Sequence, residues 1–133
     1  MAAYLDAAEV RPALVLSSSA LRTRQTLSIV LPALGPELIV SLERGLYTFS
    51  SRPVLERLTR VPTDMAGVLV VGHNPATEEL ARDLARPSEA LDALRIKYPT
   101  GALAAFDLDI DLWSALTPGC GDLTAFVTPA SLG

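Results

Sequence analysis

The chain has 133 residues, half of them hydrophobic and a fifth charged, which suits one folded domain over residues 1–133 rather than a disordered segment. A formal net charge of −4 and a single cysteine argue against a general nucleic-acid binder, an internal disulfide and a cysteine-based metal cluster. No apolar run approaches the roughly 18 residues that a membrane span needs, and no signal peptide is recognisable, so we expect a cytoplasmic protein without membrane contact.

Residues 1–10 have the composition of a short helix, which an Arg-Pro pair ends. A helix this short at a chain end is marginal unless it docks, so we expect it to be the tail of a longer one. Residues 13–16 predict a buried strand, and the serines at 17–19 are the expected N-cap of a helix that starts near Ala20.

Two arginines, Arg22 and Arg24, fall in the first turn of this predicted helix. The helix dipole disfavours a cation there. An arginine is better tolerated at that end if it shares an anion with the free backbone N–H groups. Taken alone, however, each arginine also fits a solvated helix face.

The middle of the chain continues the alternation of strands and helices. Residues 37–42 predict a peripheral strand, and Ser51 is the expected cap of a helix over residues 52–60. The valine-rich run at 67–71 predicts a second buried strand, because continuous apolar runs are typical of strands covered on both faces.

The only histidine, His73, lies between that strand and the next helix. Gly72 ends the strand, Asn74 is a candidate cap, and Pro75 suits the first helical position. Free N–H groups and the dipole make a helix N-terminus attractive to anions, so His73 is a candidate anion ligand. A lone histidine is also compatible with a purely structural role.

The last third of the chain predicts a short helix at 89–94, a turn at 98–101, and strands at 102–109 and 123–127. About a dozen residues without a helical pattern join the last two strands, so we expect them to be antiparallel neighbours. The alternation of strands and helices elsewhere predicts an α/β fold with a mostly parallel sheet, which this last pair makes mixed.

Four segments together resemble one known family. Ser-Ser-Ala-Leu-Arg-Thr-Arg-Gln-Thr (18–26) and Val-Gly-His-Asn-Pro (71–75) resemble the histidine phosphatase superfamily. Tyr-Pro-Thr-Gly-Ala-Leu-Ala (98–104) and Leu-Thr-Ala-Phe-Val-Thr-Pro (123–129) are similar to its SixA-type phosphohistidine phosphatases. The resemblance implies a three-layer αβα fold of the phosphoglycerate mutase type.

The resemblance also implies an activity. Members of this family hydrolyse phosphohistidine or a small phosphomonoester through a phosphohistidine intermediate, without metal or other cofactor, so the implied partner is a phosphorylated protein or a small phosphomonoester. A histidine in an Arg-His-Gly segment attacks phosphorus, while the adjacent arginine, a second arginine and a second histidine hold the phosphoryl oxygens. By position, Arg22 resembles the second arginine and His73 the second histidine, which makes both candidate catalytic and phosphate-binding residues.

One part of the family pattern is absent from these 133 residues. There is no Arg-His-Gly, and Gly72 precedes the only histidine. The chain therefore resembles the family without its N-terminal strand, so we expect it to be truncated and inactive as given. The alternatives are a non-catalytic phosphate- or phosphoprotein-binding module, a remnant without function, and an acid or sugar phosphatase of a neighbouring branch. The short length disfavours the last of these.

Several other residues invite a functional interpretation that the sequence supports less well. Arg24 is expected to be a surface residue. Glu43 is expected to lie in an exposed loop, although other branches of the family have an acid in this region. Tyr47 and Trp113 are expected to serve packing rather than substrate stacking. Cys120 lies between two glycines with no histidine near it in sequence, so no catalytic role is expected for it.

Overall fold

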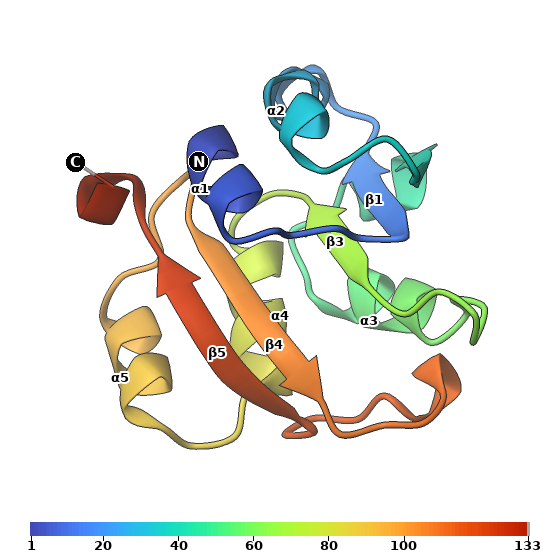
Figure 1. Cartoon of the computed structure of the whole chain (residues 1–133). Helices are drawn as coiled ribbons and strands as arrows, with labels where there is room; N and C mark the ends of the chain where they lie inside the picture. The colour runs from blue at the N-terminus through green and yellow to red at the C-terminus, as the bar shows by residue number, and fades with distance from the viewer. Residues whose placement is uncertain (133) are drawn as a thin grey trace.

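The computed structural model of the protein describes residues 1–132, in which helices and strands alternate along most of the chain (Figure 1). The helices of this part are α1 (Ala2–Ala7), α2 (Leu21–Val30), α3 (Arg52–Leu58), α4 (Ala76–Leu84) and α5 (Glu89–Ile96). Its strands are β1 (Leu14–Ser18), β2 (Ile39–Glu43), β3 (Val68–Val71), β4 (Leu103–Leu108) and β5 (Gly121–Val127). These elements lie close to their predicted positions.

Strand β1 is the centre of a parallel three-stranded ladder, with β2 on one edge and β3 on the other. The register places Leu14 opposite Ile39 on one side and Val68 on the other. Every residue of β1 is buried, as expected for a strand that is paired on both edges and covered on both faces. β2 forms one outer edge, which confirms its predicted peripheral place.

Strands β4 and β5 form an antiparallel pair, as predicted, with a register irregularity between Ala105 and Phe106. They make a ladder of their own, because within residues 1–132 β4 does not hydrogen-bond to β3. β4 runs in the opposite direction to β3 (Figure 1). The single mixed sheet that the sequence predicts is therefore divided into two ladders at this point.

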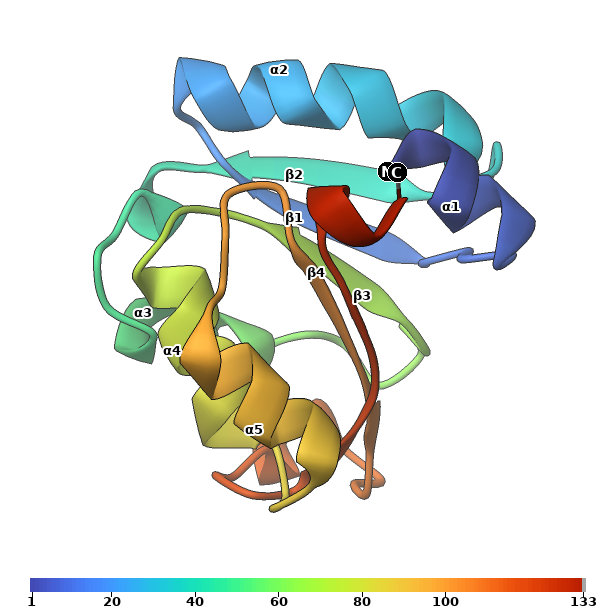
Figure 2. The ribbon, with the colours of Figure 1, turned by 90° about the vertical axis from the view of Figure 1, so that its left-hand side faces the viewer.

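Helices cover both faces of the strands (Figure 2). On one face, Val15 packs with Leu5 of α1 and with Leu27 of α2. On the other face, Leu14 and Leu16 pack against α3 and α4. This alternation follows from the two-residue period of a strand. Helix α5 packs through Leu91 and Leu94 in a third apolar cluster that includes side chains of β4 and β5. The result is a three-layer αβα arrangement, as predicted.

The predicted serine cap of the second helix is wrong. β1 continues through Ser17 to Ser18, and α2 begins only at Leu21, with Ala20 in the N-cap position and no side-chain cap. Burial of both serines explains the difference, because their hydroxyls bond within the strand end instead. The hydroxyl of Thr23 lies 2.8 Å from the carbonyl oxygens of Ser18 and Ala20, which holds the helix start to the strand end.

The predicted Asn74 cap is also wrong, because Pro75 occupies the N-cap position of α4. The Asn74 side-chain oxygen accepts a hydrogen bond from the Thr77 hydroxyl at 2.6 Å instead. Ser51 does precede α3 as predicted, but its hydroxyl donates to Asp83 at 2.7 Å rather than accepting from the helix backbone. The contact joins α3 to α4, a long-range partner that a local pattern does not reveal.

Candidate functional site

The carboxyl ends of β1 and β3 meet at one edge of the parallel ladder, where ligands of α/β sheets usually bind. Ser18 is the last residue of β1, and His73 follows β3 after Gly72. The two side chains touch, since His73 Nε2 lies 2.8 Å from Ser18 Oγ. Ser18 is fully buried. The imidazole is therefore held by a rigid, buried partner.

The hydrogen bonds around Ser18 indicate which ring nitrogen of a neutral His73 carries the proton. Ser18 Oγ already accepts the Ala20 N–H at 3.2 Å, and among the described residues its own proton has no acceptor other than His73 Nε2. We therefore assign Ser18 as the donor, which places the proton of the neutral ring on Nδ1. This leaves Nδ1–H as the remaining hydrogen-bond donor of His73.

An aromatic pair flanks the histidine. The Tyr47 ring lies 4.8 Å from the His73 ring, centroid to centroid, at an interplanar angle of 33°. Phe49 packs edge-on against Tyr47 at 6.4 Å. Tyr47 thus packs, as the sequence predicts, but against His73 rather than in the core, and it stays 57% exposed. Trp113 does pack on the core, and its indole N–H donates to the Met65 carbonyl.

A cavity of about 1350 Å³ adjoins the histidine. Its lining includes both His73 and Arg22, which lies in the first turn of α2. Arg24, two residues further on, is exposed but does not line the cavity. Within residues 1–132, the Arg22 guanidinium makes no ion pair or hydrogen bond with another side chain, so its fork is available to an anion. The structure thus brings the two predicted site residues to one cavity.

Glu43, which the sequence predicts in an exposed loop, instead ends β2 and is partly buried. Its carboxylate accepts both a hydrogen bond from Ser41 and an ion-paired contact from Arg57 Nε at 2.7 Å. Partial burial alone would raise the pKa of this carboxyl group, but the hydrogen bonds from Arg57 and Ser41 outweigh it and hold the pKa below its usual value. Glu43 is engaged in a structural ion pair.

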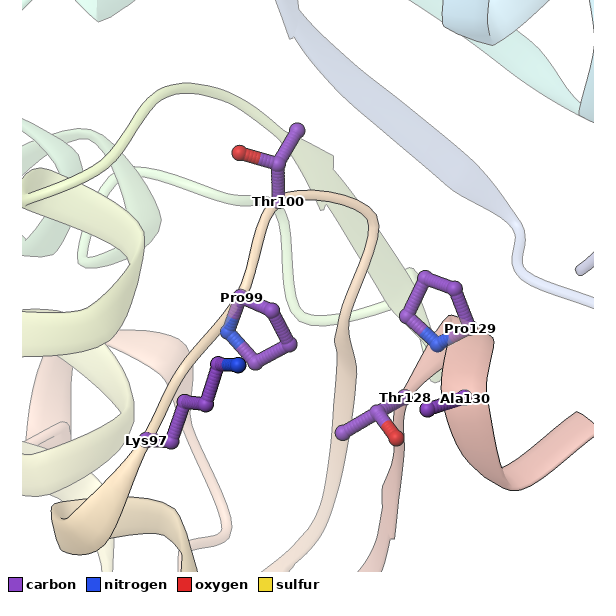
Figure 3. A pocket seen from close by; sticks show the side chains of 6 residues that line it. All are labelled: Lys97, Pro99, Thr100, Thr128, Pro129 and Ala130. Carbon is purple, nitrogen blue, oxygen red and sulfur yellow. The ribbon is translucent and has the colours of Figure 1, made fainter.

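A second, smaller cavity of about 300 Å³ lies between the turn before β4 and the end of β5 (Figure 3). Lys97 and Pro99 lie on one side of it, and residues 128–130 on the other. Lys97 is the only charged residue of its lining, which contains no carboxylate, histidine or cysteine. This lining has fewer groups that could bind or react with a ligand than the cavity beside His73, so we place the candidate site at the larger cavity.

Three further observations bear on the kind of site. In the part of the chain that the structure describes, no three His, Cys, Asp or Glu side chains converge to hold a metal ion. None of the described helices is long and apolar enough to span a bilayer. Cys120 is a free cysteine that is buried in the core.

Sequence reasoning missed two members of the site, Ser18 and Tyr47. Ser18 could have been found as a polar residue at the carboxyl end of a buried strand, a position that often carries function. Tyr47 reaches His73 from a loop, and no local pattern predicts that contact.

Comparison with solved structures identifies two close neighbours in fold. The proposed phosphohistidine phosphatase SixA from Nakamurella multipartitia superposes with a TM-score of 0.75 at 27% identity, over 96% of this chain and 81% of that one. The proposed phosphohistidine phosphatase SixA from Agrobacterium tumefaciens gives a TM-score of 0.77 at 28% identity, over 96% of this chain and 75% of that one. The fold and these neighbours define an α/β protein of the phosphoglycerate mutase-like class.

Sequence comparison finds two relatives of this chain. Uncharacterized proteins from two Mycobacterium tuberculosis strains, CDC 1551 / Oshkosh and H37Rv, are each 36% identical over 119 residues, which span 86% of this chain and 72% of theirs. No protein-family model matches the sequence. The structural neighbours, the four sequence motifs and the position of His73 at the carboxyl end of β3 all point to one family. The chain belongs to the SixA-type branch of the histidine phosphatase superfamily.

Proposed function

We propose that residues 1–133 form the phosphate-binding part of a phosphohistidine phosphatase, a hydrolase that acts on a phosphorylated protein or a small phosphomonoester. In this proposal, Arg22 and His73 hold the phosphoryl oxygens. Two features of one cavity carry the proposal: a partly buried Ser18–His73 hydrogen bond at the carboxyl ends of parallel strands, and an Arg22 guanidinium without a side-chain partner among the described residues. The names of the two structural neighbours support the substrate class.

The chemistry of phosphoryl transfer assigns a task to each group. A guanidinium fork matches two oxygens of a tetrahedral oxyanion, and its charge stabilises the negative charge that the transferring group carries. The Nδ1–H of His73, fixed by the Ser18 hydroxyl on the opposite nitrogen, is suited to donate to a third oxygen. Both groups act by position and charge, and neither needs a metal ion for this role.

The role of the nucleophile is not filled by any residue of this site within the 133 residues. His73 is the only histidine, and it cannot both attack phosphorus and hold the phosphoryl oxygens. We therefore propose that the nucleophile belongs to a segment outside this sequence and that the chain as given has no turnover. The single-domain organisation and the cytoplasmic location expected from the sequence also stay predictions.

A second candidate function is a non-catalytic module that binds phosphate or a phosphoprotein. The observation that favours it is the same lone histidine, because an anion clamp needs no nucleophile. The two functions differ in what happens once a histidine nucleophile is supplied: the phosphatase gains turnover, and the module does not.

The test measures turnover and anion binding on the purified chain. We expect no hydrolysis of a chromogenic phosphomonoester or a phosphohistidine peptide. Inorganic phosphate should bind with a dissociation constant on the order of millimolar, as expected for one or two charge-assisted contacts. Arg22→Ala should weaken this binding several-fold more than the matched control Arg24→Ala. Equal effects of the two substitutions would contradict the role of Arg22, and turnover that disappears in His73→Ala would contradict the inactivity.

A further inference from the structure

The hydrogen bond from Ser18 leaves one rotation of the His73 ring loosely held. The backbone of His73 is fixed, because its carbonyl oxygen accepts the Thr77 N–H at 2.9 Å. The torsion between Cβ and an imidazole ring is intrinsically broad. Nε2 lies at the far end of the ring and closer to the axis of this torsion than Nδ1 does. The Ser18 contact at 2.8 Å therefore restrains Nε2 more strongly than it restrains the direction of Nδ1–H.

The Tyr47 ring restrains the same rotation. It lies against the imidazole with the two ring centroids 4.8 Å apart and the two ring planes at 33°. The centroid distance falls in the range of packed aromatic pairs. A turn of the imidazole about the bond between Cβ and Cγ would drive one of its edges into the Tyr47 ring. The hydrogen bond thus fixes one point of the imidazole, and the aromatic contact fixes its plane.

Tyr47 is itself held by contacts on both sides of it in the chain. Its N–H donates to the Arg44 carbonyl oxygen at 3.0 Å, and the neighbouring Leu46 is buried in the core beside α3 and α4. On the other side, the Ser51 N–H donates to the Glu79 carboxylate at 3.1 Å. Because the loop between β2 and α3 is anchored at both ends, the position of the Tyr47 ring does not depend on its contact with His73.

Core packing does not explain the two aromatic side chains of this loop. Tyr47 is 57% exposed, and Phe49, which packs edge-on against it, is 69% exposed. Tyr47 also does not line the cavity of about 1350 Å³ to which His73 contributes. It therefore contacts the imidazole without closing the cavity to a ligand.

We infer that Tyr47 is a positioning residue, whose ring fixes the plane of the His73 imidazole before a ligand arrives. A donor that is held in place beforehand loses less conformational freedom when it binds an anion. The use of Nδ1–H for a phosphoryl oxygen rests on the proposed function, whereas the restraint on the ring rests only on the contacts described above. The two contacts differ in effect: the Ser18 hydroxyl selects the nitrogen that carries the proton, and the Tyr47 ring selects the orientation of the imidazole.

The test compares Tyr47→Phe, which keeps the ring, with Tyr47→Leu, which removes it. Because His73 is the only histidine, its ring signals in an NMR spectrum of the 133-residue chain are unambiguous. We expect carbon relaxation to show a more mobile imidazole in Tyr47→Leu and an ordered one in Tyr47→Phe. The proton should stay on Nδ1 in both variants because Ser18 is intact. Phe49→Leu is the matched control, since it removes the outer ring of the aromatic pair, and it should leave the imidazole ordered.

Titration with inorganic phosphate measures the consequence for binding. Tyr47→Leu should weaken binding by about two- to tenfold, which corresponds to the cost of ordering one freed side chain. Tyr47→Phe and Phe49→Leu should bind phosphate as the wild type does. Urea unfolding checks that the variants fold. Because Tyr47 and Phe49 are both more than half exposed, the two leucine variants should have similar urea midpoints.

An imidazole that is equally ordered in Tyr47→Leu and in the wild type would overturn the inference. Equal losses of order in Tyr47→Phe and Tyr47→Leu would overturn it too, because the hydroxyl rather than the ring would then hold His73. The failure of the proposed function gives a different result. A mobile imidazole in Tyr47→Leu with unchanged phosphate binding, or with no phosphate binding by the wild type, would contradict His73 as a phosphate ligand and leave its positioning by Tyr47 supported.

Discussion

Ser18→Ala tests how the imidazole at the centre of the site is held. The Ser18 hydroxyl is fully buried and makes two hydrogen bonds, to His73 Nε2 at 2.8 Å and from the Ala20 N–H at 3.2 Å. A buried hydrogen bond contributes about 1 kcal/mol net, so the loss of both should lower the free energy of unfolding by about 2 kcal/mol. For a chain of this size, each kcal/mol corresponds to a melting-temperature change of about 3–5 °C.

Ser17→Ala is the matched control, because Ser17 is equally buried but its hydroxyl donates only to the Ser18 carbonyl, at 3.0 Å. It should cost about 1 kcal/mol, roughly half as much. Urea unfolding measures both costs. Nitrogen NMR of the ring in mildly alkaline buffer reports which nitrogen of His73 carries the proton. The wild type should have it on Nδ1, and only Ser18→Ala should disturb that preference. A proton on Nε2 in the wild type, or identical spectra for the two variants, would refute the reasoning.

Two further predictions concern the scaffold. Because the pKa of Glu43 is held below its usual value in the fold, the Glu43–Arg57 pair stabilises the protein above the unfolded-state pKa and loses this effect as the pH falls through the folded-state pKa. The difference in urea midpoint between wild type and Glu43→Gln should therefore shrink on acidification, and a constant difference would contradict it. Leu94→Ala should cost about 2–5 kcal/mol because Leu94 is fully buried, whereas Ile96→Ala, at an 86% exposed position of the same helix, should change the free energy of unfolding by under about 0.5 kcal/mol.

The sequence predicts most elements well because their signals are local. The apolar period of α4, the valine-rich run of β3 and the short connection between β4 and β5 each depend on neighbouring residues. These signals are enough to predict the α/β class and the antiparallel pairing of the last two strands. The placing of His73 between a strand and a helix is local too, and for this reason the candidate histidine could be identified.

The contacts that sequence reasoning missed join distant residues. Ser18 and His73 are 55 residues apart, and the serine hydroxyls could equally have capped a helix by local criteria alone. Glu43 and Arg57 are 14 residues apart, and their pairing removes the glutamate from the exposed loop where the sequence predicts it. In each case a polar side chain bonds to a residue that is distant in sequence instead of following its local preference.

The comparison of β1 with β3 shows where sequence and structure differ most. Both strands are continuous apolar runs or nearly so, which indicates burial on both faces. β1 is buried throughout, yet all four residues of β3 are only half-buried. The strands share a ladder and a direction and are covered by helices of the same layers, so the remaining difference is the open edge of β3. The sequence of β3 is therefore suited to a central strand, whereas within residues 1–132 one edge of β3 has no paired strand.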